Sequence, residues 1–196
     1  MRNAGWILAL ASAPLWAQPL TQGERDFAMS ELHATRKGLL DAIAGLSPAQ
    51  WNFKPAPDRW SIAEVAEHLV LSEDYMSQWA GKMLKSPEVA PRGAGRSQDA
   101  DLLRLMADRS KKAQASVETQ PAGRWATPAA LVEEFKLRRD RTIAYLQTTQ
   151  DALRAHLSGT GADAFDAYQM LLMISGHTAR HLAQIDEVKA DPRYPR

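Results

Sequence analysis

The chain has 196 residues, of which 45% are hydrophobic, and it carries 24 basic and 23 acidic side chains. Length and apolar content suit one domain with a single core. The balanced charge argues against nucleic acid as a partner, because nucleic-acid-binding proteins present a basic face. The sequence contains no cysteine. This excludes disulfides, a thiol nucleophile and a lipid-anchored N-terminal cysteine, so any metal must be held by histidine, carboxylate or water.

Residues 1–17 have the composition of a secretory signal peptide. Arg2 precedes an apolar segment that ends at Ala17, a small residue suited to cleavage. The segment is shorter than the roughly 20 residues that span a bilayer, and Pro14 interrupts it. We therefore expect a secreted or periplasmic protein that begins near Gln18 and has no stable membrane insertion after cleavage. A buried N-terminal helix is the alternative.

The first helix is predicted from about residue 22 to residue 44. Its apolar positions recur at helical spacing and are Met29, Leu32, Leu39 and Ile43. Gly45 followed by Leu46 is typical of a left-handed C-terminal cap. Ser47 and Pro48 then predict one further short helical turn.

The second long helix is predicted to begin after Ser61, which forms a capping box with Glu64, while Trp60 and Val65 occupy the positions of a hydrophobic staple. The inward face of this helix carries Val65, His68, Ser72, Met76 and Trp79. His68 is therefore expected to point into the core. The tryptophans Trp51, Trp60, Trp79 and Trp125 are expected to be core or boundary anchors.

A long connection, residues 86–126, separates the second long helix from the third. It begins with a segment rich in proline and glycine and continues with a short surface helix predicted from Asp99 to Val117. Thr127 and Pro128 open the third long helix as cap and first residue. Its expected buried stripe consists of Leu131, Phe135, Ile143 and Leu146.

The last helix is predicted to begin near Asp163, after two glycines. Its apolar face includes two histidines one turn apart and consists of Met170, Ile174, His177, His181, Ile185 and Val188. No stretch alternates with the period of a strand. The sequence therefore predicts an all-α four-helix bundle whose long connection lets neighbouring helices run parallel.

Three inward histidines, His68, His177 and His181, suggest a shared ligand. Without one, several buried ring nitrogens would need separate hydrogen-bond partners, whereas a single divalent cation can satisfy three of them. Zinc is the default, although imidazole also suits nickel, copper and iron. The other two histidines, His33 and His156, are expected to be solvated and receive no role.

The motifs present and absent in the sequence argue against several common kinds of chemistry. The pair His177 and His181 has the spacing of helical zinc-protease ligands, but Thr178 occupies the position where that motif requires the general-base glutamate. A nucleophile elbow, a Walker loop and a dinucleotide-binding motif are also absent from the sequence. Glu64 is the acidic residue nearest to His68 that could serve as a base, and its predicted capping role competes for it.

Two segments, FKPAPDRWSIAEVAEHL and HTARHLAQI, resemble the DinB/YfiT-like superfamily. The resemblance covers roughly residues 22–190. It implies an up-down-down-up four-helix bundle, often a homodimer, with a divalent metal on His68, His177 and His181 and at least one open coordination position. Characterised relatives include thiol-dependent S-transferases and a mycothiol-dependent isomerase, so the resemblance implies a small thiol as a candidate substrate.

Two functions remain open on the sequence. In the first, zinc, nickel or iron at the three histidines activates a small nucleophile, either a thiol or water, for S-transferase-like or hydrolytic chemistry. In the second, the protein is a metal-holding or stress-related binding protein that catalyses no reaction. A carboxylate near the metal would favour hydrolysis, a dry apolar pocket would favour thiol transfer, and a closed fourth position would favour binding alone.

Overall fold

A computed structural model describes residues 18–89, 96–110, 114–125, 127–160 and 164–196. The predicted leader and the predicted helix start at Asp163 lie outside these residues. The helices are α1 (Gln22–Ile43), α2 (Pro48–Asn52), α3 (Ile62–Met83), α4 (Arg96–Ala107), α5 (Pro128–Thr148) and α6 (Ala167–Lys189). Two 3-10 turns, η1 (Val117–Thr119) and η2 (Leu153–Ala155), and two short strands, β1 (Leu157–Ser158) and β2 (Phe165–Asp166), complete the described elements.

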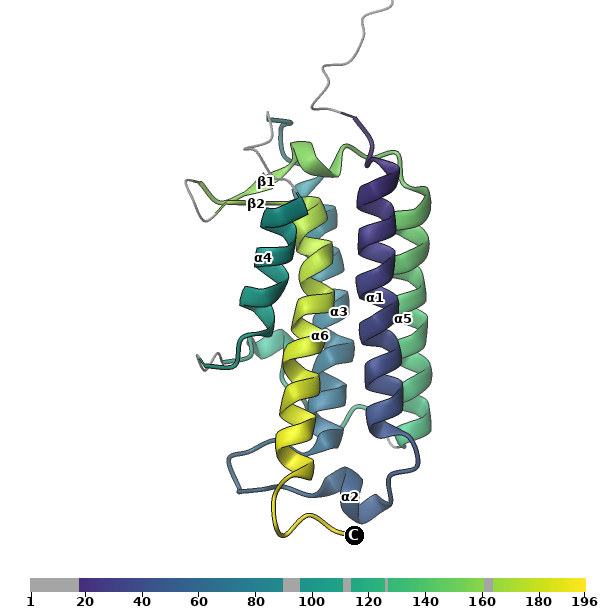
Figure 1. The fold of residues 1–196 in the computed structure, drawn as a ribbon, viewed down its shortest axis with the longest axis vertical. Helices are drawn as coiled ribbons and strands as arrows, with labels where there is room; N and C mark the ends of the chain where they lie inside the picture. Colours follow the sequence, from purple (N-terminus) through teal and green to yellow (C-terminus); the bar gives the residue numbers. More distant parts are fainter. Residues whose placement is uncertain (1–17, 90–95, 111–113, 126, 161–163) are drawn as a thin grey trace, which may run out of the picture.

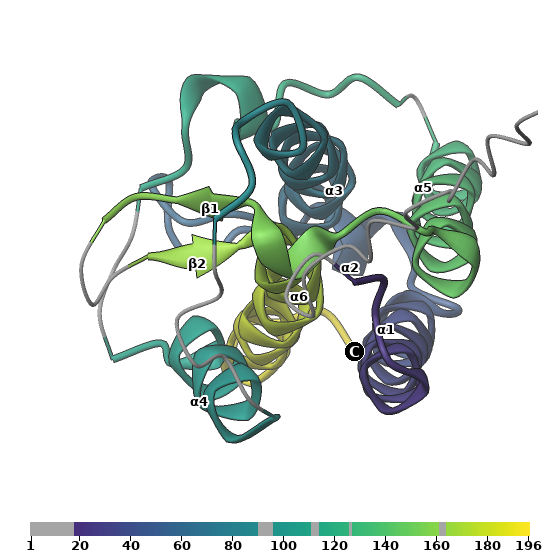
Figure 2. The ribbon, with the colours of Figure 1, turned by 90° about the horizontal axis from the view of Figure 1, so that it is seen from above.

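The four long helices α1, α3, α5 and α6 form the predicted bundle. Figure 1 shows that α1 and α6 run in one direction and that α3 and α5 run in the other. Seen from above, α1 and α6 are neighbours and so are α3 and α5 (Figure 2), so each pair is parallel. This is the up-down-down-up order, and it is possible because the long connection returns the chain to the bottom of the bundle between α3 and α5.

The predicted helix caps are confirmed. The side chains of Ser61 and Glu64 each accept a hydrogen bond from the other residue's backbone N–H at the start of α3. Ser47 caps α2 in the same way. Gly45 follows α1 with φ of +67°, which lies in the left-handed region expected of a C-terminal cap. Local signals therefore fix where α1 ends and where α3 begins.

Two expected boundaries were wrong. The last helix begins at Ala167, capped by Asp166. Directly before it, β1 and β2 pair as an antiparallel ladder of two residues in each strand, which had not been predicted. Strands this short offer too few residues to show an alternating pattern. The surface helix α4 ends at Ala107 and does not continue to Val117. The apolar cluster of this segment gives way to polar residues after Ala107.

Helix α4 lies along α6, on the side of the bundle away from α1 and α5 (Figure 2). The contact is close because Gly176 has no side chain: a Cβ atom there would lie 2.8 Å from the Cβ of Met106. At the other end of α4, Arg154 donates hydrogen bonds to Asp99 and Asp166 and also to Glu24 of α1. These contacts hold α4 against the residues that precede His177.

The core confirms most of the apolar stripes and corrects one position. Trp51 is 7% exposed, as expected of an anchor, but Trp79 is 38% exposed. The buried face of α3 continues through Ala80 and Met83, so Trp79 lies beside it. Its ring instead contacts Phe165 of β2.

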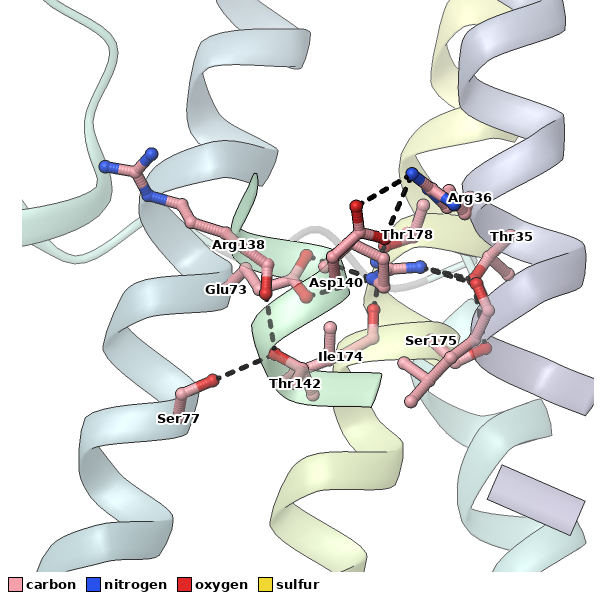
Figure 3. A network of polar contacts seen from close by, with 12 residues as sticks. Thr35, Arg36, Glu73, Ser77, Arg138, Asp140, Thr142, Ile174, Ser175 and Thr178 are labelled. Carbon is pink, nitrogen blue, oxygen red and sulfur yellow. Dashed lines mark hydrogen bonds and ion pairs between the residues drawn. The ribbon is translucent and has the colours of Figure 1, made fainter. Parts of the chain in front are cut away.

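A polar network crosses the centre of the bundle (Figure 3). The Arg139 side chain is fully buried and donates through Nε to both carboxylate oxygens of Glu73, at 2.9 and 3.1 Å. Its other nitrogens donate to the backbone carbonyl of Leu32, to Thr35 and to Thr178. Arg139 of α5 thus contacts α1, α3 and α6 at one level.

In the described part of the chain, no helix combines the length and apolar character needed to cross a membrane.

Candidate metal centre

The structure brings the three predicted histidines together. His68 lies on α3, and His177 and His181 lie one turn apart on α6, which packs antiparallel to α3. The Nε2 atom of His177 is 3.2 Å from the Nε2 atoms of both His68 and His181. One ligand atom from each ring lies within 4.8 Å of the other two. The three side chains therefore converge on one point between the two helices.

His68 is oriented by the last residue of η1, Thr119. Its Nδ1 lies 2.7 Å from the backbone oxygen of Thr119. Because a carbonyl oxygen only accepts hydrogen bonds, Nδ1 carries the proton, which leaves the Nε2 lone pair free to face the other histidines. The ring is 4% exposed, so both its tautomer and its direction are set by surrounding protein.

The loop that follows Thr119 is itself held by a carboxylate on α3. The Glu67 side chain is buried and accepts hydrogen bonds from the backbone N–H groups of Ala122, Gly123 and Arg124, at 2.8 to 3.1 Å. Gly123 has φ of +72°, a conformation that favours glycine. Glu67 therefore holds the loop directly after Thr119, the residue whose carbonyl orients His68.

His181 is oriented within its own helix. Its Nδ1 lies 2.8 Å from Oε1 of Gln184, one turn further along α6. With Nδ1 donating to this amide oxygen, the lone pair of His181 is also on Nε2. In His177, Nδ1 is buried and has no hydrogen-bond partner among the described residues. Its Nε2 is the atom placed between the other two rings.

The geometry fits a divalent ion. With Zn–N bonds of about 2.0–2.1 Å, two imidazole nitrogens at a tetrahedral ion are separated by about 3.3 Å, close to the 3.2 Å found here. At most one of the three nitrogens could carry a proton to share with a neighbour. A cation at the point of convergence would accept all three lone pairs at once, which is the donor arrangement preferred by zinc, nickel and iron.

The three rings are held neutral, as a metal requires of its imidazole ligands. Burial lowers the pKa of His181 to about 3, and its neighbour His68 lowers it too. Burial, together with the other two histidines, also holds the pKa of His177 well below its usual value. Burial lowers the pKa of His68, although its hydrogen bond to Thr119 opposes the shift. Protons therefore compete weakly for these nitrogens near neutral pH.

Two further side chains lie against the cluster. The Trp60 ring contacts His68, with 4.9 Å between ring centroids, and is nearly parallel to the ring of His181 at 6.3 Å. The hydroxyl of Ser72 lies 3.4 Å from Nε2 of His68 and is buried. Trp60 thus supports one side of the cluster with an apolar surface, and Ser72 adds a polar group.

The sequence model of one family matches residues 31–185, a range that includes all three histidines. The chain belongs to the DinB superfamily. The matched range contains the whole of α3 and α5 and the greater part of α1 and α6. The fold and the family resemblance expected from the sequence are therefore confirmed.

Two proteins of Bacillus subtilis are similar to this DinB-superfamily chain. The uncharacterised protein YuaE of strain 168 is 27% identical over 169 residues, which are 82% of this chain and 96% of YuaE. Among solved structures, YfiT is described as a probable metal-dependent hydrolase with an unusual four-helix bundle topology. The TM-score with YfiT is 0.58 at 15% identity, and the similarity covers 87% of this chain and 88% of YfiT. The likeness to YfiT establishes the fold.

The remaining candidates, His33, His156 and Glu64, are not part of the cluster. His33 is exposed, as expected. The expectation that His156 is solvated was wrong: it is 7% exposed, and its Nδ1 lies 3.0 Å from the backbone oxygen of Ser86. It follows η2 and leads into the hairpin, so neighbouring chain covers it. Glu64 is occupied by its cap and by an ion pair with Lys54.

Sequence reasoning missed the residues that orient the histidines. Thr119 and Gln184 contribute oxygens to His68 and His181, and Glu67 fixes the loop. A glutamine three residues after His181 was a readable signal, because that spacing places both side chains on the same face of a helix. Ser72 was placed on the inward stripe, but its position one turn after His68 was not recognised as a place beside the site.

Proposed function

We propose that this DinB-superfamily protein is a metal-dependent enzyme that activates a small nucleophile at one divalent ion held by His68, His177 and His181. The observation that carries the proposal is the convergence of the three rings: Nε2 of His177 lies 3.2 Å from Nε2 of both His68 and His181, and one ligand atom from each ring lies within 4.8 Å of the other two. Zinc is the ion expected first, with nickel or iron as alternatives.

The protein residues set the charge of the site. Three neutral imidazoles leave a divalent ion its full double charge, whereas thiolate or carboxylate ligands would reduce it. When bound, the ion supplies the Lewis acidity that lowers the pKa of water or a thiol. Thr119 and Gln184 hold the two flanking rings in the tautomer that presents Nε2. Such hydrogen-bond partners increase the basicity of a ligating ring.

The donor set also favours an open fourth position. A structural zinc site normally has four protein ligands. No aspartate or glutamate of the described residues joins the three-histidine cluster, and the sequence has no cysteine. A small molecule can therefore complete the coordination.

Water and a small thiol are the two nucleophiles that suit this arrangement. The description of YfiT as a probable metal-dependent hydrolase supports water. The resemblance to thiol-dependent S-transferases supports a thiol. The carboxylates nearest in sequence to His68 are committed elsewhere: Glu67 to the loop and Glu64 to its cap. With neither free as a general base, we place thiol transfer ahead of hydrolysis, because a thiol deprotonates on binding a divalent ion.

Because the hydrogen bonds of Glu67 and Glu64 leave neither carboxylate free as a base, a second candidate is also supported: a metal-holding protein that catalyses no reaction. A binding protein needs the three histidines but no base and no exchangeable position. The two functions differ in whether small molecules can reach the ion, and this difference can be measured.

Cobalt(II) provides the test, because its visible absorption reports a change in its ligands. We expect the cobalt-substituted protein to change its spectrum when 2-mercaptoethanol or azide is added, and to change it with pH between about 6 and 9, where water at a divalent ion titrates. The His68→Ala variant should show none of these responses. A spectrum from bound cobalt that is indifferent to thiol, azide and pH would favour the binding protein.

We also infer that the protein is exported, from the order of Arg2, an apolar segment and Ala17 at its N-terminus. Protein recovered from the periplasm or the medium of its host should begin at or near Gln18. N-terminal sequencing measures this directly. A chain from that fraction that still begins with Met1 would contradict the inference.

A further inference from the structure

Ser72 is a buried hydroxyl in an unusual place. It lies on α3 one turn after His68, it is 4% exposed, and its Oγ is 3.4 Å from Nε2 of His68. This is the only hydrogen bond that the described structure gives to its side chain. Its one polar contact is therefore with the nitrogen that faces the metal centre.

Two other buried hydroxyls inside the helices of this bundle behave differently. Thr142 donates to the backbone oxygen of Arg138, and Thr178 donates to that of Ile174, each four residues earlier. Such a bond is the usual way for a buried serine or threonine in a helix to be satisfied. Ser72 makes no such bond within the described residues, so its hydroxyl is directed to the site and not to its own helix.

Metal binding would take away the one partner that Ser72 has. Because Nδ1 of His68 donates to Thr119, Nε2 is the acceptor and the Ser72 hydroxyl is the donor. An ion that uses the Nε2 lone pair leaves this buried hydroxyl without an acceptor. A buried donor without a partner is costly, so a new acceptor is expected within reach.

The fourth coordination position is where that acceptor belongs. At a tetrahedral ion, the fourth ligand atom lies about 3.3 Å from each imidazole nitrogen. The Ser72 oxygen is 3.4 Å from one of these nitrogens, Nε2 of His68, so a ligand atom held beside that nitrogen can come within its hydrogen-bonding reach. We propose that Ser72 is a binding residue whose hydroxyl donates a hydrogen bond to a small anionic ligand, such as a thiolate or azide, held at the fourth position. The proposal rests on the three-histidine ion of the proposed function.

Replacing Ser72 with cysteine tests its position directly. Cysteine has nearly the same shape, and the chain contains no other thiol. If the side chain reaches the ion, cobalt(II)-loaded Ser72→Cys should show thiolate-to-cobalt charge-transfer absorption in the near ultraviolet without any added thiol. Its visible spectrum should also stop responding to azide, because the fourth position is then closed. This readout does not depend on any enzymatic activity.

Ser77→Cys is the matched control. Ser77 lies five residues further along the same helix, and its hydroxyl pairs with Thr142 of α5, 3.5 Å away. The control adds one thiol to α3 on a side that does not face the histidines. It should show the wild-type cobalt spectrum and the wild-type response to azide.

Ser72→Ala gives a second measurement that needs no new ligand. It should bind cobalt as the wild type does, and it should bind azide about tenfold more weakly, the usual effect of removing a hydrogen bond to a charged group. This inference would be overturned if the wild-type protein binds cobalt, Ser72→Cys shows no charge-transfer absorption, and Ser72→Ala keeps the azide affinity of the wild type. Those results would leave the three-histidine site intact. Failure of the wild-type protein itself to bind cobalt would overturn the proposed function.

Discussion

The double variant His177→Ala, His181→Ala should lose stoichiometric binding of a divalent ion. It leaves only His68 of the three converging rings, and a single imidazole on a protein surface or in its interior is a weak ligand. Even the loss of a group that merely orients a ligand costs about 10–100-fold in metal affinity. Removal of two ligands should therefore lower the affinity by more than about 100-fold. Elemental analysis after dialysis measures the metal content.

His33→Ala is the control for this loss. His33 is an exposed histidine on α1, so its removal tests whether metal content depends on the number of histidines or on their position. The control should keep the metal content of the wild type. One divalent ion per chain in the double variant would refute the site. His156 is less suitable as a control, because it is buried and its replacement would also disturb the fold.

The convergence of the three histidines could be predicted because it depends on the local period of two helices. His68 falls on the inward stripe of α3, and His177 and His181 fall on that of α6. The caps that fix the phase of α3 were also readable, since a capping box involves residues only three apart. Once two amphipathic helices pack face to face, side chains on the two stripes must meet.

The groups around the histidines could not be predicted in the same way. Glu67 is adjacent to His68 but lies on another side of α3, where a charged residue is normally solvated. It is buried because the loop at Ala122 to Arg124 covers it. The path of such a loop is set by tertiary contacts and not by a repeating pattern, so neither Glu67 nor Thr119 carried a signal in the sequence.

Arg139 did carry a signal that the sequence reading passed over. The predicted buried stripe of α5 consists of Leu131, Phe135, Ile143 and Leu146, and Phe135 and Ile143 are eight residues apart. Arg139 stands halfway across that gap, four residues from each neighbour, and so lies on the same stripe. A charged residue at a core position of a helix indicates a buried partner on another helix, and Glu73 is that partner.

Replacing Arg139 with methionine should destabilise the fold by about 3–5 kcal/mol, because the change leaves Glu73 as an uncompensated charge in the core. This is a large part of the roughly 5–15 kcal/mol that holds a typical domain together. Both side chains are almost fully buried, at 0% and 2% exposure, so solvent offers little relief. Urea denaturation measures the free energy of unfolding.

The double variant Arg139→Met, Glu73→Gln separates the buried charge from the loss of packing. Replacement of both members of a buried ion pair is often far less costly than replacement of one, so the double variant should recover part of the stability that Arg139→Met loses. Lys136→Met is the control on the same helix, since it breaks the exposed ion pair with Glu133 and should change stability little. If Arg139→Met proves no more destabilising than Lys136→Met, or if the double variant is as unstable as the single one, the penalty does not come from the uncompensated charge of Glu73.

Arg139 also donates to Thr178, the residue that follows His177. Metal content measured in the same variants therefore shows whether the register of α6, which sets the position of His177 and His181, depends on this buried pair.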